Sequence, residues 1–300
     1  MNKTPMQRPD RERPLTAGMI RSAIGQFPEE VRRNKPRLYS FAYISIIEYF
    51  LGEQWAERYI LPETAKRKSF LFPDIEVTGR NIVWLIDILQ LADCLYNLQS
   101  VPGFDAALAP MRGGDIESTM SVLIAGKLLK QAGKIFQFIE PIGVEGADYD
   151  IAVMYAPDQF AFLEVKCKSR ATVKSYNTVI NTLNRAMGQL PADHPGIVFM
   201  QFPDPWVDVV DGNRRVSGDL FLAALDFLRN SRRVAMLVFY TTFIGPGEES
   251  TTVDHGLVEL LNDDSRYAGK DWTLFGALTQ QHIHQNWDGV EKYPPEALIT

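Results

Sequence analysis

The sequence contains little cysteine. Only two cysteines occur among its 300 residues, Cys94 and Cys167, and they lie far apart. Small secreted domains that depend on disulfides are much richer in cysteine, whereas intracellular proteins keep their thiols reduced. We therefore expect both side chains to be reduced core thiols in a cytoplasmic protein. A disulfide between them is the minor alternative.

Long hydrophobic runs are also lacking. A membrane-spanning helix needs roughly 20 predominantly apolar residues. The longest candidate, residues 82–98, is interrupted by Asp87, Gln90 and Asp93. The first 14 residues are polar and carry no apolar run of the kind found in secretory signals. We therefore expect no membrane segment, no membrane partner and no secretory leader.

The chain has no excess of positive charge. It carries 31 Lys and Arg against 37 Asp and Glu, for a net charge of −6. A protein that coats nucleic acid without specificity is usually basic, so any site for a polyanion must be a local patch. No glycine-rich phosphate loop is present. The few histidines lack a partner cluster at metal-ligand spacing, and we expect solvated or capping roles for them: His194, His255, His282 and His284.

Hydrophobic periodicity divides the chain into three parts. Residues 1–15 are rich in Pro and Arg and are predicted to be disordered. Residues 16–105 are predicted to form a helical N-terminal region, and residues 106–300 an α/β domain with its core at 115–244. From residue 115 the pattern gives a helix, three strands, a helix, a strand, a helix and a strand. Short turns predict antiparallel pairing of the first three strands, and intervening helices predict parallel pairing of the later ones, hence a mixed central sheet flanked by helices.

The stretch 146–168 holds most of the candidate chemistry. It is predicted to form two short strands joined by a turn. Because strand side chains alternate between faces, Glu164 and Lys166 share one face of the second strand, and Asp148 and Asp150 share a face of the first. A hairpin would bring one or two Asp, one Glu and one Lys together above an apolar layer. Such a set suits binding a divalent cation and activating water beside it.

Basic residues follow the second predicted strand. Lys168 shares the face of Lys166, and Arg170 and Lys174 come next in a polar segment, with Arg185 further along. These side chains would neutralise a phosphate backbone locally although the protein is acidic. An ordinary solvated turn is the alternative.

A further carboxylate lies on the predicted helix 116–131. Glu117 begins an apolar row that continues with Met120. It would either contribute to a site or interact with the helix dipole as a solvated first-turn residue. The residues alone leave both interpretations open.

Together these features resemble the PD-(D/E)XK nuclease superfamily, which has the restriction-endonuclease-like fold. The predicted element order matches that family's core over roughly residues 116–244. The proline that precedes the first motif Asp is missing here, and Ala147-Asp148-Tyr149-Asp150 stands in its place. We favour Asp150 as the motif residue, because an apolar strand follows it directly, and keep Asp148 as the alternate. The residues that carry the resemblance are Asp150, Glu164-Val165-Lys166, Glu117 and Gln189.

The resemblance implies a Mg²⁺-dependent nuclease, an endonuclease that hydrolyses phosphodiester bonds, with Mn²⁺ as a substitute ion. Asp150 and Glu164 would be the metal ligands, with the main-chain oxygen of Val165 as a further ligand. Lys166 would position or deprotonate the attacking water, and Glu117 would reach the metal through water or orient Lys166. Gln189 occupies a position that is functional in some branches of the family. The implied partner is nucleic acid, with DNA favoured over RNA, and dimerisation is common in the family.

Two other functions stay open. One is a catalytically inactive protein of the same fold that acts in nucleic-acid binding or assembly. The other is an enzyme of a different class in which the Glu-X-Lys pattern is accidental. The latter predicts that Asp150, Glu164 and Lys166 do not converge in the folded chain.

Overall fold

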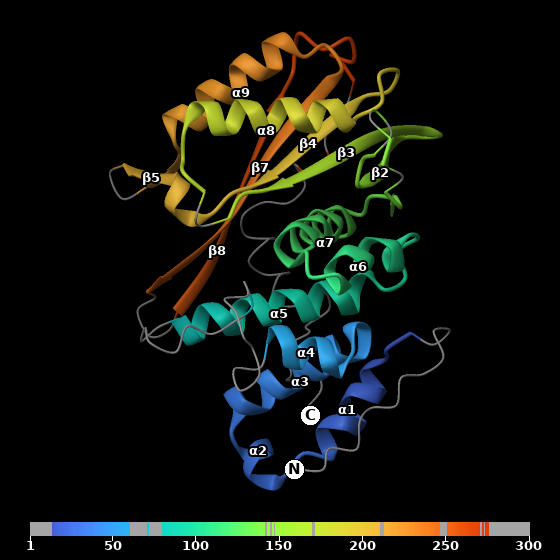
Figure 1. The fold of residues 1–300 in the computed structure, drawn as a ribbon, viewed down its shortest axis with the longest axis vertical. Helices are drawn as coiled ribbons and strands as arrows, with labels where there is room; N and C mark the ends of the chain where they lie inside the picture. Colours follow the sequence, from blue (N-terminus) through green and yellow to red (C-terminus); the bar gives the residue numbers. More distant parts are fainter. Residues whose placement is uncertain are drawn as a thin grey trace. The chain divides into compact units, whose positions relative to one another are not determined.

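The structure is a computed structural model that describes residues 14–60, 71, 80–141, 143–144, 146, 148–169, 172–210, 213–246, 251–270, 272 and 274–275. The predicted disorder of residues 1–15 and the predicted phosphate contact at Arg170 therefore fall largely or wholly outside the described residues. The chain divides into two compact units (Figure 1). One comprises Met1–Ser100 and Asn286–Thr300, and the other comprises Val101–Gln285.

The first unit is helical over its described residues. Its helices are α1 (Ala17–Gly25), α2 (Glu29–Arg33), α3 (Lys35–Leu51), α4 (Glu53–Tyr59) and α5 (Arg80–Leu98). Helix α3 packs against each of the other four. Thr16 caps α1 by accepting a hydrogen bond from the main-chain N of Met19. Within the described part of the chain, no helix combines the length and apolar character needed to cross a bilayer.

A mixed six-stranded sheet forms the centre of the second unit. Its strands are β1 (Phe136–Phe138), β2 (Ile151–Ala156), β3 (Gln159–Cys167), β4 (Gly196–Gln201), β7 (Val234–Pro246) and β8 (Thr251–Leu261). They lie in the order β1-β2-β3-β4-β7-β8. The first three are antiparallel, β3, β4 and β7 are parallel, and β8 returns antiparallel to β7. The predicted α/β class and mixed sheet are confirmed.

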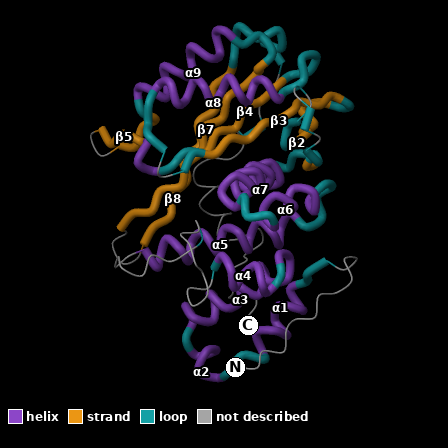
Figure 2. Tube along the Cα trace, viewed as in Figure 1, coloured by secondary structure: helices purple, strands orange, loops and turns teal. Residues whose placement is uncertain are grey.

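Helices cover both faces of this sheet (Figures 1 and 2). Helices α8 (Tyr176–Gln189) and α9 (Gly218–Asn230) pack on one face, where they share a core with β4 and β7. Helix α7 (Ile116–Gln131) packs against β3 on the other face. There the Ser121 hydroxyl donates a hydrogen bond to Oε1 of Gln201 at 2.6 Å. Side chains of β3 therefore point alternately toward α8 and toward α7.

Several elements of this unit are wholly or partly absent from the sequence prediction. Helix α6 (Phe104–Arg112) precedes α7 and packs against it. A short 3₁₀ turn, Asp204–Trp206, leads into a hairpin of β5 (Val207–Val210) and β6 (Asn213–Val216). Strand β8 was predicted only in part, as a short element at residues 257–261.

Gly103 is required where α6 meets β1. Its φ is +80°, and a Cβ there would lie 2.0 Å from the carbonyl oxygen of Phe138. We expect Gly103→Ala to destabilise the protein by about 3 kcal/mol, because left-handed backbone and a clash with main chain act together. Urea denaturation measures this loss. Gly218→Ala is the control, because its Cβ would meet no atom within 4 Å; an equal loss in both variants would contradict the explanation.

Candidate active site

The β2–β3 hairpin brings Asp150 and Glu164 together. Ile151 pairs with Leu163 across the two strands, so the residues next to them, Asp150 and Glu164, also face one another. The main-chain N of Asp150 donates to the Leu163 carbonyl at 3.1 Å. Its side chain turns toward β3, where Oδ2 accepts a hydrogen bond from the main-chain N of Val165 at 2.7 Å. Asp150 is thus held by two hydrogen bonds beside the Glu164 carboxylate.

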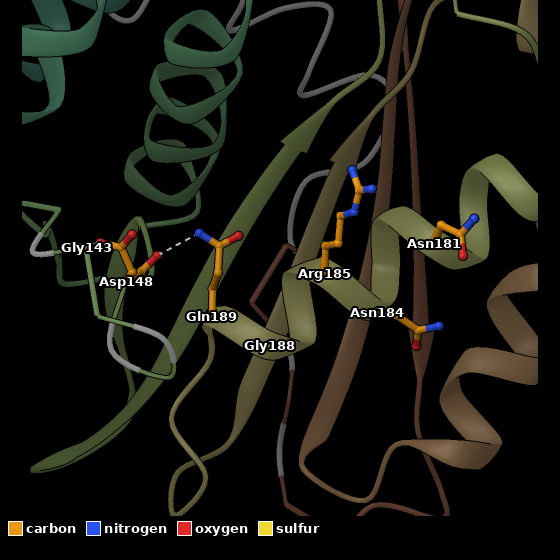
Figure 3. A pocket seen from close by; sticks show the side chains of 7 residues that line it. All are labelled: Gly143, Asp148, Asn181, Asn184, Arg185, Gly188 and Gln189. Carbon is orange, nitrogen blue, oxygen red and sulfur yellow. Dashed lines mark hydrogen bonds between the residues drawn. The ribbon is translucent and has the colours of Figure 1, made fainter.

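Lys166 links this carboxylate pair to helix α8. Its Nζ lies 2.6 Å from Oε1 of Glu164, which is only 2% exposed. The same Nζ donates to the side-chain oxygen of Gln189, the last residue of α8. The Gln189 amide in turn donates to the main-chain oxygen of Asp148 at 3.2 Å (Figure 3). The sequence predictions for Asp150, Glu164, Lys166 and Gln189 therefore fall in one connected group of side chains.

Burial sets the charge state of the two carboxyl groups. Removal from water raises the pKa of both Asp150 and Glu164, and for Glu164 the next largest cause is the charge of Asp150. For Asp150 the Val165 hydrogen bond works in the opposite direction, and the Lys166 ammonium does so for both groups. Asp148 adds negative charge nearby and raises both pKa values further. One ammonium does not compensate for two buried carboxylates, so the pair favours a proton or an additional cation between them.

The oxygen atoms of this pair suit a divalent cation. Oε2 of Glu164 is buried and accepts no hydrogen bond from the described residues. Mg²⁺ and Mn²⁺ prefer oxygen ligands, and Mg²⁺ usually keeps several waters when bound by one or two carboxylates. The described residues contain no ready group of three or more His, Cys, Asp and Glu side chains for a metal. The donor set therefore fits an ion that water and substrate oxygens also coordinate, with Asp150 and Glu164 as its protein ligands.

An open cleft of about 650 Å³ adjoins this group (Figure 3). The loop before β2 supplies one side, where Oδ1 of Asp148 accepts a hydrogen bond from the main-chain N of Gly143 at 3.2 Å. Helix α8 supplies the other side through Asn181, Asn184, Arg185, Gly188 and Gln189. The sequence prediction missed the two asparagines and Gly188 as cleft residues. Asn181, Asn184 and Gly188 are three and four residues apart, which places them on one face of the helix. This spacing could have been recognised in the sequence.

Only part of the predicted basic segment lies at the site. Burial lowers the pKa of Lys168, and the nearby charges of Arg185 and Lys166 lower it further. Lys168 therefore lies within electrostatic reach of Arg185 and Lys166, and Arg185 lines the cleft. Lys174 instead forms an ion pair with Asp208, with its Nζ 2.9 Å from Oδ1. The structure does not bring Lys174 to the site.

Glu117 lies on the other face of β3. It belongs to the first turn of α7, and its charge contributes to the raised pKa of Cys167. Cys167 and Lys166 are adjacent in the strand and therefore point to opposite faces. The predicted catalytic role of Glu117 stays a prediction. The same holds for the Val165 carbonyl, because the hydrogen bond described at that residue comes from its main-chain N.

Comparison of the chain with protein-family models, with curated proteins and with solved structures found no significant match. The chemistry of the site therefore has to be inferred from the arrangement of its own side chains.

Proposed function

We propose that this protein is a metal-dependent nuclease that hydrolyses phosphodiester bonds, most readily in DNA. The observation that carries the proposal is the convergence of Asp150, Glu164, Lys166 and Gln189 beside an open cleft. Two buried carboxylates next to a lysine suit a site that holds a divalent cation and a phosphate together. An accidental Glu-X-Lys pattern would not require Asp150 to meet the other two residues.

Each side chain then has a defined task. Asp150 and Glu164 would hold Mg²⁺ or Mn²⁺, and such an ion lowers the pKa of bound water and stabilises charge that develops on a phosphate. The Lys166 ammonium stands beside Glu164, where it can hold the attacking water or neutralise a phosphate oxygen. Gln189 fixes the lysine by accepting one of its hydrogen bonds. Lys168 and Arg185 supply positive charge for the neighbouring phosphates.

The fold around the site supports the finer family proposal. Helix α7, strands β1 to β3, helix α8 and strand β4 follow one another in the order expected of the PD-(D/E)XK core. The Asp precedes β2, the Glu-X-Lys lies on β3, and the Gln ends the next helix. We propose a restriction-endonuclease-like core on this order. Pairing of two such cores in a homodimer stays a prediction.

Cleavage assays test the function. We expect the purified protein to cut DNA in Mg²⁺ or Mn²⁺ and to stop in EDTA, because Asp150 and Glu164 need the ion. Plasmid, linear duplex, single-stranded DNA and RNA are assayed in parallel. Asp150→Asn is expected to be inactive, while Asp219→Asn, an exposed position in the first turn of α9, is expected to match the wild type.

Two outcomes would overturn this function. Cleavage that persists in EDTA would exclude a metal-dependent reaction at Asp150. Binding of nucleic acid without cleavage in either metal would favour the alternative, a protein of this fold that acts only in nucleic-acid binding or assembly.

A further inference from the structure

A second cavity lies on the same hairpin as the candidate active site. It measures about 480 Å³ and shares no lining residue with the cleft along α8. Asp158 and Asp193 also line this cavity, but rings and one lysine make up about half of its walls: Tyr149, Tyr155, Phe162, His194, Tyr267 and Lys270. None of these residues is part of a site predicted from the sequence, and His194 is expected there to be solvated or capping.

One wall is a set of three rings in contact. The centroids of Tyr149 and Phe162 are 4.3 Å apart with the planes tilted, and the Phe162 and His194 rings meet edge to face at 4.9 Å. Tyr149 and Phe162 are half-buried and also pack on the core beneath α8. Because that core fixes the two rings, they present a rigid aromatic wall. His194 is exposed at its end.

The opposite wall combines rings with a positive charge. The Lys270 Nζ lies 5.1 Å from the ring centroid of Tyr155 and 5.8 Å from that of Tyr267. It also donates a hydrogen bond to the Tyr155 hydroxyl at 2.8 Å. The buried ring of Trp272 supports Tyr155 from behind, with centroids 4.7 Å apart. An exposed ammonium is thus held at the mouth of an aromatic cavity.

The cavity adjoins the site of proposed hydrolysis. Phe162 precedes Glu164 by two residues and shares its face of β3, which places it about 7 Å along the strand. Tyr149 stands between Asp148 and Asp150 in the loop that enters β2. A strand with one phosphate at Glu164 would therefore have a neighbouring nucleotide within reach of this cavity.

We propose that the aromatic cavity binds an unpaired nucleobase of the strand whose phosphate occupies the candidate active site. The inference rests on the proposed nuclease function and adds a substrate class to it. Aromatic walls accept any base by stacking, and a lysine beside them suits the attached phosphate. A base inside a duplex cannot enter such a cavity unless it leaves the helical stack. The site therefore selects single-stranded, frayed or flipped nucleotides over intact duplex.

Fluorescent oligonucleotides test this site directly. A short single strand carrying 2-aminopurine is titrated with protein in EDTA, so that binding is measured without cleavage. We expect quenching of the probe, because stacking on aromatic rings quenches it. In His194→Ala and Lys270→Ala, both exposed, and in Phe162→Leu, we expect single-strand affinity to fall about 5- to 100-fold, the range that base–aromatic stacking contributes. Affinity for an intact two-stranded, blunt-ended duplex is expected to change less than about threefold.

Phe221→Ala provides the matched control. This ring is 42% exposed on α9 and does not line the cavity, so its removal is expected to leave both affinities unchanged. Thermal denaturation checks that each variant is folded; if Phe162→Leu is not, the two exposed positions carry the test. Equal losses for single strand and duplex, or no loss for either, would overturn the proposal.

The two inferences fail separately. Metal-dependent cleavage by wild type, with single-strand affinity unchanged in the ring variants, would refute the base site and keep the nuclease. Loss of single-strand affinity in the ring variants of a protein that cleaves nothing would refute the nuclease and keep the base site.

Discussion

Lys166→Met is expected to lower the rate of metal-dependent cleavage by at least about a hundredfold, the effect of removing one preorganised charge from a reacting centre. Methionine keeps most of the side-chain length and loses the ammonium. The change removes the hydrogen bonds to Glu164 and Gln189 at once. It also leaves the buried Glu164 carboxylate without the neighbouring ammonium that lowers its pKa. The pKa of Glu164 is therefore expected to rise in this variant. Initial rates on labelled DNA, measured over a range of substrate concentrations, give kcat and KM separately.

Lys174→Met is the matched control for this variant. Lys174 follows the same strand, and the sequence suggested a phosphate contact there, but its ammonium is paired with Asp208. We expect its removal to change the rate less than about threefold, the cost of a partly exposed ion pair being small. A Lys166→Met protein as active as the Lys174→Met protein would show that Lys166 does not take part in the reaction.

The sequence predicted that Asp150, Glu164 and Lys166 lie near one another because Glu164 and Lys166 lie on a regular strand and Asp150 directly precedes its neighbour. Alternation in β3 assigns Glu164 and Lys166 to one face without knowledge of the rest of the fold. The choice of Asp150 over Asp148 rests on the strand that begins directly after Asp150. The hydrogen bond that Asp150 accepts from the main-chain N of Val165 agrees with this choice. Asp148 instead accepts a hydrogen bond from Gly143 at the cleft wall. The geometry thus favours Asp150 within the carboxylate pair.

The contacts that sequence reasoning could not supply depend on long-range packing. Glu117 lies on a predicted helix, but the pattern of one helix does not say which face of the sheet it covers. Lys174 meets a partner, Asp208, from a strand that was not predicted. The rings of the second cavity come from segments more than 100 residues apart, such as Tyr155 and Tyr267. No local spacing relates them.

In the fold, too, the elements with clear local signals were predicted and those that depend on long-range pairing were missed. Helix α7 begins and ends as predicted. Asp115 occupies the N-cap position, although its side chain makes no capping hydrogen bond, and Gly133 follows the helix with a φ of +68°, a common end signal. Strand β8 was largely missed, since Asp254, His255 and Gly256 interrupt its apolar pattern. Its order comes from pairing with β7 over its whole length. Helix α6 contains Pro110, which argues against a helix when read locally.

Lys127→Met is expected to stabilise the protein by a few kcal/mol at pH 7. Lys127 lies in α7 with 0% of its side chain exposed, and burial lowers its pKa to about 7 from 10.5. Between those two values the unfolded chain takes up a proton that the folded chain does not bind. The free energy of unfolding of the lysine protein therefore decreases as pH falls from about 10.5 to 7, and it stops decreasing below pH 7. Methionine fills similar space with no charge to remove from water.

Urea denaturation of both proteins at pH 7 and pH 10 measures this difference. The stabilisation by methionine is expected to be large at pH 7 and to shrink to less than about 1 kcal/mol at pH 10, which is close to the lysine pKa of 10.5 in the unfolded chain. Lys130→Met, an exposed position on the same helix, is expected to change stability by less than about 0.5 kcal/mol at either pH. A gain from Lys127→Met that is equal at the two pH values would mean that packing, and not the protonation of a buried lysine, limits stability at this helix.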